Sequence, residues 1–147
     1  MTKTALVTGA SSGIGRGIAH KFGEEGWEVT LVARRKSNLE KVAKEVEDAG
    51  GKAHIFATDL TEEGNPDAAV QFAIDKMGKI GTLVNNAGMG RFEMVPDIKD
   101  ESYQEQFQLN VWTLCGNTVY CVSHVSGNHG PFLFLRSAPF LSSIKLG

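Results

Sequence analysis

A glycine-rich segment near the N-terminus constrains the fold of this chain more than any other feature. Residues 8–15 read Thr-Gly-Ala-Ser-Ser-Gly-Ile-Gly and directly follow the apolar run of residues 4–7. Beyond the first glycines, apolar residues recur at helical spacing, at Ile14, Ile18 and Phe22. This order predicts a β-strand, then a tight turn, then the N-terminus of a helix.

Such a turn can hold a pyrophosphate, because backbone N–H groups and the positive end of the helix dipole face the ligand. Gly9 can adopt backbone angles that other residues rarely adopt, and Gly13 and Gly15 have no side chain to keep a phosphate or the strand away. A tight turn without a ligand is the alternative. The strand and helix expected on either side favour a dinucleotide site.

Apolar runs and helical patterns alternate over residues 4–114. We expect strands at residues 4–7, 28–33, 53–57 and 82–85. We expect helices at residues 13–25, 37–49, 66–77 and 101–114. Short apolar runs are typical of strands covered on both faces, and right-handed crossovers then give the strand order 3-2-1-4. The sequence therefore predicts an α/β fold, a Rossmann-type parallel sheet with helices on both faces. An irregular C-terminal tail follows, in which residues 132–135 could add one short strand.

Four motifs follow one another along this part of the chain: the glycine segment, Asp59-Leu60, Asn85-Asn86-Ala87-Gly88 and Asn110-Val111. Together they resemble the signatures of the short-chain dehydrogenase/reductase family, over about residues 2–114. The resemblance implies an NAD(P) cofactor and hydride transfer to or from a carbonyl or alcohol. The cofactor-binding residues that we expect are Gly9, Ser11, Ser12, Gly13, Ile14, Gly15, Arg34, Arg35, Asp59, Leu60, Asn86, Ala87 and Gly88.

Two arginines indicate which nicotinamide cofactor to expect. In this fold an acidic residue near the end of the second strand binds the adenosine ribose and selects NAD, but Ala33 is followed by Arg34 and Arg35. An arginine guanidinium can hold a 2′-phosphate instead. The alternative is a solvated basic turn that continues into Lys36. We expect NADP(H) rather than NAD, with Arg34 as the main contact and the Ser11 hydroxyl as a second one.

Asp59 and Asn110 each have two interpretations. The Asp59 carboxylate could accept the adenine amino group, as the resemblance implies, or it could form a turn before Thr61. Asn110 lies in the middle of an expected helix, where asparagine has low propensity, so we expect a buried partner or a kink there. In the family the matching asparagine positions a water behind an active-site lysine. By its family position Asn110 is the candidate catalytic residue, but that lysine is missing here, which favours a structural role for Asn110.

The catalytic signature of the family does not occur in this sequence. Relatives use a serine and a Tyr-x-x-x-Lys pair, whereas Tyr103 is followed four residues later by Phe107, and Tyr120 by His124. Ser137 falls in the order along the chain where the family serine would stand. We expect incidental roles for these residues.

The composition changes near Leu114. All 17 acidic residues lie between Glu24 and Glu105, and residues 113–147 contain only Arg136 and Lys145 as charged residues. We therefore expect an NAD(P)-binding domain at residues 1–114 and a divergent tail at residues 115–147. A frameshift or a natural divergent ending would each explain the tail.

Charge and hydropathy limit the function classes. A net charge of −2 gives no electrostatic reason to expect nucleic acid or an anionic membrane as partner, and no apolar run reaches membrane-spanning length. Cys115 and Cys121 do not have metal-site spacing. With no signal-peptide pattern at the N-terminus, we expect a cytoplasmic protein.

Three functional hypotheses follow. The first is an NADP(H)-dependent oxidoreductase for a small-molecule carbonyl or alcohol substrate, truncated before its Ser and Tyr-x-x-x-Lys residues. The second is a non-catalytic nucleotide-binding or interaction module. The third is a non-functional truncated product. The resemblance also implies a homo-oligomer in full-length relatives.

Overall fold

The computed structural model describes residues 3–90, 99–124 and 132–134, with side chains described up to residue 119. The strands are β1 (Thr4–Thr8), β2 (Glu28–Ala33), β3 (Lys52–Ala57), β4 (Thr82–Asn85) and β5 (Phe132–Phe134). The helices are α1 (Gly13–Glu24), α2 (Lys36–Asp48), α3 (Asn65–Met77), α4 (Asp100–Phe107), the π-helical segment η2 (Gln108–Trp112) and α5 (Thr113–His124).

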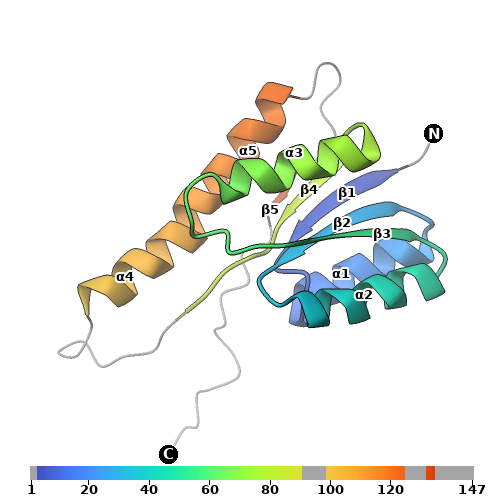
Figure 1. Cartoon of the computed structure of the whole chain (residues 1–147), viewed down its shortest axis with the longest axis horizontal. Helices are drawn as coiled ribbons and strands as arrows, with labels where there is room; N and C mark the ends of the chain where they lie inside the picture. The colour runs from blue at the N-terminus through green and yellow to red at the C-terminus, as the bar shows by residue number, and fades with distance from the viewer. Residues whose placement is uncertain (1–2, 91–98, 125–131, 135–147) are drawn as a thin grey trace, which may run out of the picture.

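The strands form one parallel sheet in the order β3-β2-β1-β4-β5. The predicted order 3-2-1-4 is confirmed, and the short strand expected at residues 132–135 is present as β5 beside β4. Helices α1 and α2 cover one face of the sheet, while α3 and α5 lie over the other (Figure 1). The strand, helix, strand alternation of the sequence produces this arrangement, since each parallel pair needs a helical crossover.

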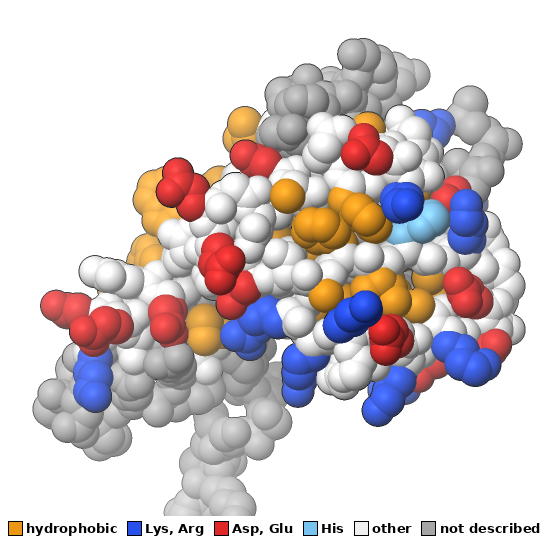
Figure 2. Space-filling model, in the orientation of Figure 1, with side chains coloured by type: hydrophobic (Ala, Val, Ile, Leu, Met, Phe, Trp, Pro, Cys, Tyr) orange, Lys and Arg blue, Asp and Glu red, His pale blue; other side chains and the backbone are white. Residues whose placement is uncertain are grey.

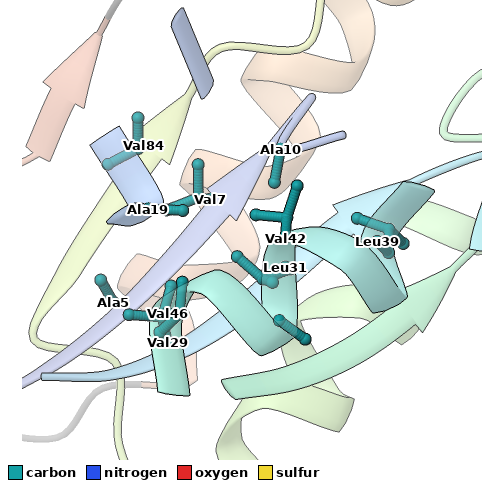
Figure 3. Close-up of a cluster of buried hydrophobic side chains, with 11 residues drawn as sticks. Ala5, Val7, Ala10, Ala19, Val29, Leu31, Leu39, Val42, Val46 and Val84 are labelled. Carbon is teal, nitrogen blue, oxygen red and sulfur yellow. The ribbon is translucent and has the colours of Figure 1, made fainter. Parts of the chain in front are cut away.

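Both faces of the central strands are buried, as the short apolar runs predicted. In β1, Ala5 and Val7 point toward α1 and α2, while Leu6 points toward α3, because successive side chains in a strand face opposite sides. Figure 3 shows the first of these clusters, in which Val42 and Val46 of α2 pack onto the sheet. The rigid sheet that results fixes where each strand ends.

The fourth helix differs from the prediction in length and in geometry. We expected one helix over residues 101–114, but α4 passes through a π-helical turn at η2 and the helix then continues as α5 to His124. The prediction ended this helix too early because residues 115–124 contain Gly116 and no Asp, Glu, Lys or Arg side chain, so their pattern gave no charged face.

Residues just beyond Leu114 pack against the sheet. Asn117 is 1% exposed and donates a hydrogen bond from Nδ2 to Oδ1 of Asn85 at 3.2 Å. The Asn85 amide in turn donates to the Thr118 hydroxyl at 3.1 Å. The expected tail therefore begins with ordered structure, whereas residues 125–131 and 135–147 lie outside the described residues. The boundary at residue 114 and the origin of the tail stay predictions.

Among the described helices, none is long and apolar enough to cross a membrane. The described part of α4 and α5 does expose several large apolar side chains. These are Tyr103, Phe107, Trp112 and Val119.

A half-buried carboxylate ties the start of β2 to β3. Glu28 Oε1 accepts hydrogen bonds from His54 Nε2 at 2.7 Å and from Lys52 Nζ at 2.8 Å. The Glu28 side chain is only 14% exposed. The bonds from His54 and Lys52 hold the pKa of the Glu28 carboxyl below its usual 4.5, against the opposing effect of burial.

This cluster predicts a pH-dependent stability. A lowered carboxyl pKa stabilises the folded state fully above the unfolded-state pKa, and that stabilisation is lost as the pH falls through the folded-state pKa. We expect Glu28→Gln to lower the free energy of unfolding by about 1 kcal/mol at pH 7, with a smaller difference from wild type at pH 3.5. Urea denaturation followed by circular dichroism measures both values.

The matched control for this prediction is Asp48→Asn, which breaks the exposed Lys44–Asp48 pair within α2. Exposed pairs of this kind contribute little, so we expect a change below about 0.5 kcal/mol. A Glu28→Gln effect that is equal at pH 7 and pH 3.5 would contradict the role of the Glu28 charge.

Candidate functional site

The glycine segment forms the turn between β1 and α1. Gly9 and Gly13 have positive φ angles of 66° and 56°. A Cβ atom on Gly9 would lie 2.8 Å from the Asn86 side chain, and one on Gly15 would collide with the Gly9 carbonyl and the Asn86 amide. Gly9 and Gly15 thus permit a close approach to the loop after β4. Gly13 faces open space, so its backbone angle alone requires glycine.

Thr8 and Asn86 join the carboxyl ends of β1 and β4. The Thr8 hydroxyl accepts hydrogen bonds from the N–H groups of Asn86 and Ala87, both at 3.0 Å, and donates to the Val84 carbonyl at 3.3 Å. The Asn86 amide donates to the carbonyls of Thr8 at 3.1 Å and Gly9 at 3.2 Å. Sequence reasoning assigned no role to Thr8. Its position directly before Gly9, at the end of the first strand, could have indicated one.

A cavity of about 350 Å³ opens where the first four strands end. All the predicted cofactor-binding residues line it except Gly15, which is buried behind the turn. The structure thus brings together residues from the glycine segment, the ends of β2 and β3, and the loop after β4. The lining residues that sequence reasoning missed are Ala33, Thr58, Thr61, Met89, Glu105 and Leu109.

One end of this cavity is the N-terminus of α1. Ser12 is the N-cap residue, but no side chain caps the helix, so its first N–H groups lack the usual side-chain acceptor. Ser12, Gly13 and Ile14 all line the cavity. Free N–H groups and the positive end of the helix dipole make this end suitable for an anion.

Arg34 and Arg35 form another part of the wall. They follow β2, and Arg35 is the N-cap residue of α2, which also has no side-chain cap. Both side chains are exposed, and neither guanidinium forms an ion pair with any residue that the structure describes. This part of the cavity therefore offers two available cations.

Asp59 lies two residues beyond the end of β3 and forms a turn. Its Oδ1 accepts hydrogen bonds from the Thr61 N–H at 2.9 Å and from the Thr61 hydroxyl at 2.7 Å. Burial raises the pKa of the Asp59 carboxyl, but the bonds from Thr61 and the charge of Arg34 outweigh it, and the pKa lies below its usual 3.8. The turn interpretation is confirmed, and the adenine interpretation stays a prediction for a carboxylate that also lines the cavity.

Asn110 lies in the π-helical segment and binds the backbone of the loop after β4. Its Nδ2 donates to the Met89 carbonyl at 2.8 Å, and its Oδ1 accepts the Met89 N–H at 2.9 Å. The partner expected for a mid-helix asparagine is therefore Met89. Asn110 itself does not line the cavity, so it acts on the site by fixing Met89, which does.

Other predicted positions are outside the described site. Tyr120 and His124 belong to α5, but their side chains are not among the described ones, and Ser137 lies outside the described residues.

A second, shallow hollow crosses the open edge of β3 between α2 and α3. Figure 2 shows apolar side chains gathered on this face, and Ile55 and Phe72 line the hollow. None of the predicted site residues lines it.

The comparisons with known proteins agree with this geometry. A family profile described as short chain dehydrogenase matches residues 3–138. This chain therefore belongs to the short-chain dehydrogenase/reductase family. The (S)-acetoin-forming diacetyl reductase of Staphylococcus epidermidis is 32% identical over 117 residues, which cover 79% of this chain and 46% of that enzyme. The chain thus spans about half the length of the curated relatives that it matches.

Solved structures have the same fold. L-sorbose reductase from Gluconobacter frateurii, in complex with NADPH and L-sorbose, has a TM-score of 0.78 and 34% identity, covering 83% of this chain and 47% of that one. NADH-dependent reductase A1-R′, in complex with NAD, has a TM-score of 0.81 and 25% identity, covering 90% of this chain and 58% of that one. Each is a structure to which this chain is similar.

Two glycines of α1 give a matched test of the turn. Gly13→Val puts a branched side chain at a positive φ, so we expect a loss of about 1–2 kcal/mol in the free energy of unfolding. Gly17 lies one turn later, also faces open space and has no positive φ. Gly17→Val is expected to be neutral or slightly stabilising, because valine has the higher helix propensity. Thermal denaturation measures both, and equal effects would contradict this account.

Proposed function

We propose that the cavity between the glycine segment and the end of β4 binds NADP(H). We further propose that the chain is the cofactor-binding part of an oxidoreductase acting on a small-molecule carbonyl or alcohol. The observation that carries the proposal is that the uncapped N-terminus of α1 and the two available arginines line the same cavity. A dinucleotide phosphate carries anions that need both features.

The residues present fit this cofactor. The N–H groups at Ser12 to Ile14 would hold the pyrophosphate, and Arg34 would hold the 2′-phosphate with Arg35 beside it. Asp59 and Leu60 would line the adenine site, and the backbone of residues 86–88 would face a ribose. When bound, NADPH would supply the hydride to a carbonyl, and NADP+ would accept it from an alcohol. The residues of this chain bind and orient it, and Asn110 holds the Met89 backbone in place.

The preference for NADP(H) rests on the chain's own residues. The solved relatives include one in complex with NADPH and one in complex with NAD, so similarity does not separate the two cofactors. Here no carboxylate follows β2, where an NAD-selecting acid would stand. A ribose hydroxyl at that place would meet guanidinium groups, which favour an anion.

A non-catalytic nucleotide-binding module is the second candidate, and a non-functional product is the third. The absence of Tyr-x-x-x-Lys from this sequence favours them over turnover. A positioned proton donor with a tuned pKa is needed for carbonyl reduction, and neither tyrosine of this sequence is followed four residues later by a lysine. A cytoplasmic location stays a prediction. So does a homo-oligomer, for which the exposed apolar side chains of α4 and α5 are the candidate surface.

Calorimetric titration tests the cofactor proposal. We expect NADPH to bind at least about tenfold more tightly than NADH, because charge-assisted hydrogen bonds contribute about 1.5–3 kcal/mol. Arg34→Ala should remove most of that preference and leave NADH binding nearly unchanged.

The control for this titration is Lys41→Ala. Lys41 is an exposed residue of α2 outside the cavity, and its removal changes the net charge equally. Equal affinities for the two cofactors in the wild type, or an equal loss in both variants, would contradict the proposal.

Turnover separates the enzyme hypothesis from the binding module. We expect folded protein with saturating NADPH to show little or no oxidation of the cofactor by aldehydes, ketones or quinones. Carbonyl reduction needs a precisely positioned proton donor, and the Tyr-x-x-x-Lys pair that would provide it does not occur in this sequence. The loss of reduced-nicotinamide absorbance measures the rate. Robust turnover that disappears in Tyr120→Phe would show that the prediction is wrong.

A further inference from the structure

The Arg16–Glu45 ion pair connects the two helices whose N-termini line the cavity. Arg16 Nε donates to Glu45 Oε2 at 2.8 Å and Nη2 donates to Oε1 at 2.6 Å, so the contact is bidentate. Arg16 directly follows the glycine segment on α1, and Glu45 lies on α2. Among the side chains that the structure describes, no other hydrogen bond or ion pair joins α1 to α2.

The backbones of the same two helices touch near their C-terminal ends. Gly23 of α1 is buried, and a Cβ atom there would lie 2.8 Å from the Val46 carbonyl oxygen. Glu45 directly precedes Val46 on α2. The two helices therefore have a backbone contact at Gly23 and a side-chain contact at Arg16, about two turns apart on α1.

The distance between these contacts matters for the cavity. Gly13 lies ten residues before Gly23, which is about 15 Å along a helix. A rotation of α1 of only about 4° around the Gly23 contact would move its N-terminus by about 1 Å. The packing of Gly15 and Ala19 opposes this rotation from inside the fold. Arg16 adds a tie on the exposed side, because a bidentate guanidinium–carboxylate pair fixes both distance and orientation.

We propose that Arg16 and Glu45 are positioning residues that set the distance between the glycine segment and Arg34. Neither residue lines the cavity. This inference rests on the proposed function, because NADPH has to contact both anion sites at once, whereas NADH uses only the one at α1. The pair therefore supports the preference for NADPH over NADH rather than nucleotide binding in general.

The test is a titration of Arg16→Gln, Glu45→Gln and the double variant with NADPH and with NADH. We expect each single variant to bind NADPH 3- to 10-fold more weakly and NADH less than 2-fold more weakly. The double variant should bind like either single variant, because each substitution already breaks the pair. Circular dichroism confirms that each variant is folded.

The directions of the affinity changes in Arg16→Gln and Glu45→Gln distinguish the positioning role from a simple charge effect. Removing a positive charge near an anion site weakens binding, and removing a negative charge strengthens it. Opposite shifts for Arg16→Gln and Glu45→Gln, additive effects in the double variant, or equal losses for both nucleotides would each overturn the inference. The control is Lys44→Gln, which breaks the Lys44–Asp48 pair within α2 and should change neither affinity.

The outcomes also separate this inference from the proposed function. If the wild type binds neither nucleotide, both are wrong. If the wild type prefers NADPH and both single variants keep that preference, the proposed function stands and the positioning role of Arg16 and Glu45 is wrong.

Discussion

The site depends on the hydrogen bonds that hold the carboxyl ends of β1 and β4 together. Thr8 accepts two backbone N–H groups of the β4 loop, and the Asn86 amide binds two carbonyls at the start of the glycine turn. Both residues are buried, so these bonds exchange little with water and their loss would leave unpaired polar groups. The turn, the N-terminus of α1 and the cavity floor are all fixed relative to this junction.

From this junction outward, the helices arrange the charges around the cavity. The N-terminus of α1 is left without a side-chain cap, and α2 begins just after two arginines that have no ion-pair partner among the described residues. These groups are exposed, so water can solvate them in the absence of a ligand. A bound dinucleotide phosphate would replace that water with charge-assisted hydrogen bonds.

The α4 to α5 helix contributes to the site from a distance along the chain. Its π-helical turn contains Asn110, which holds Met89, while Glu105 and Leu109 close the cavity wall. Sequence reasoning found Asn110 through the Asn110-Val111 motif, and its low helix propensity gave the expectation of a partner or a kink. It missed Glu105 and Leu109, because their spacing fits any amphipathic helix and only the packing of α4 over the strand ends brings them to the cavity. It also missed the π-helical turn, which has no spacing signature of its own.

The sequence by itself determined the strands, their order and most of the cavity lining. Strand order follows from alternating apolar runs and helices, and residues that follow parallel strands must meet at one edge of the sheet. The turn that Asp59 forms with Thr61 is local, and the sequence already offered it as one of two interpretations. Only the tertiary structure decided that Gly15 packs against Asn86 behind the turn and that Arg16 reaches Glu45. These two contacts depend on distances between elements that are far apart in the chain, and local propensity contains no information about such distances.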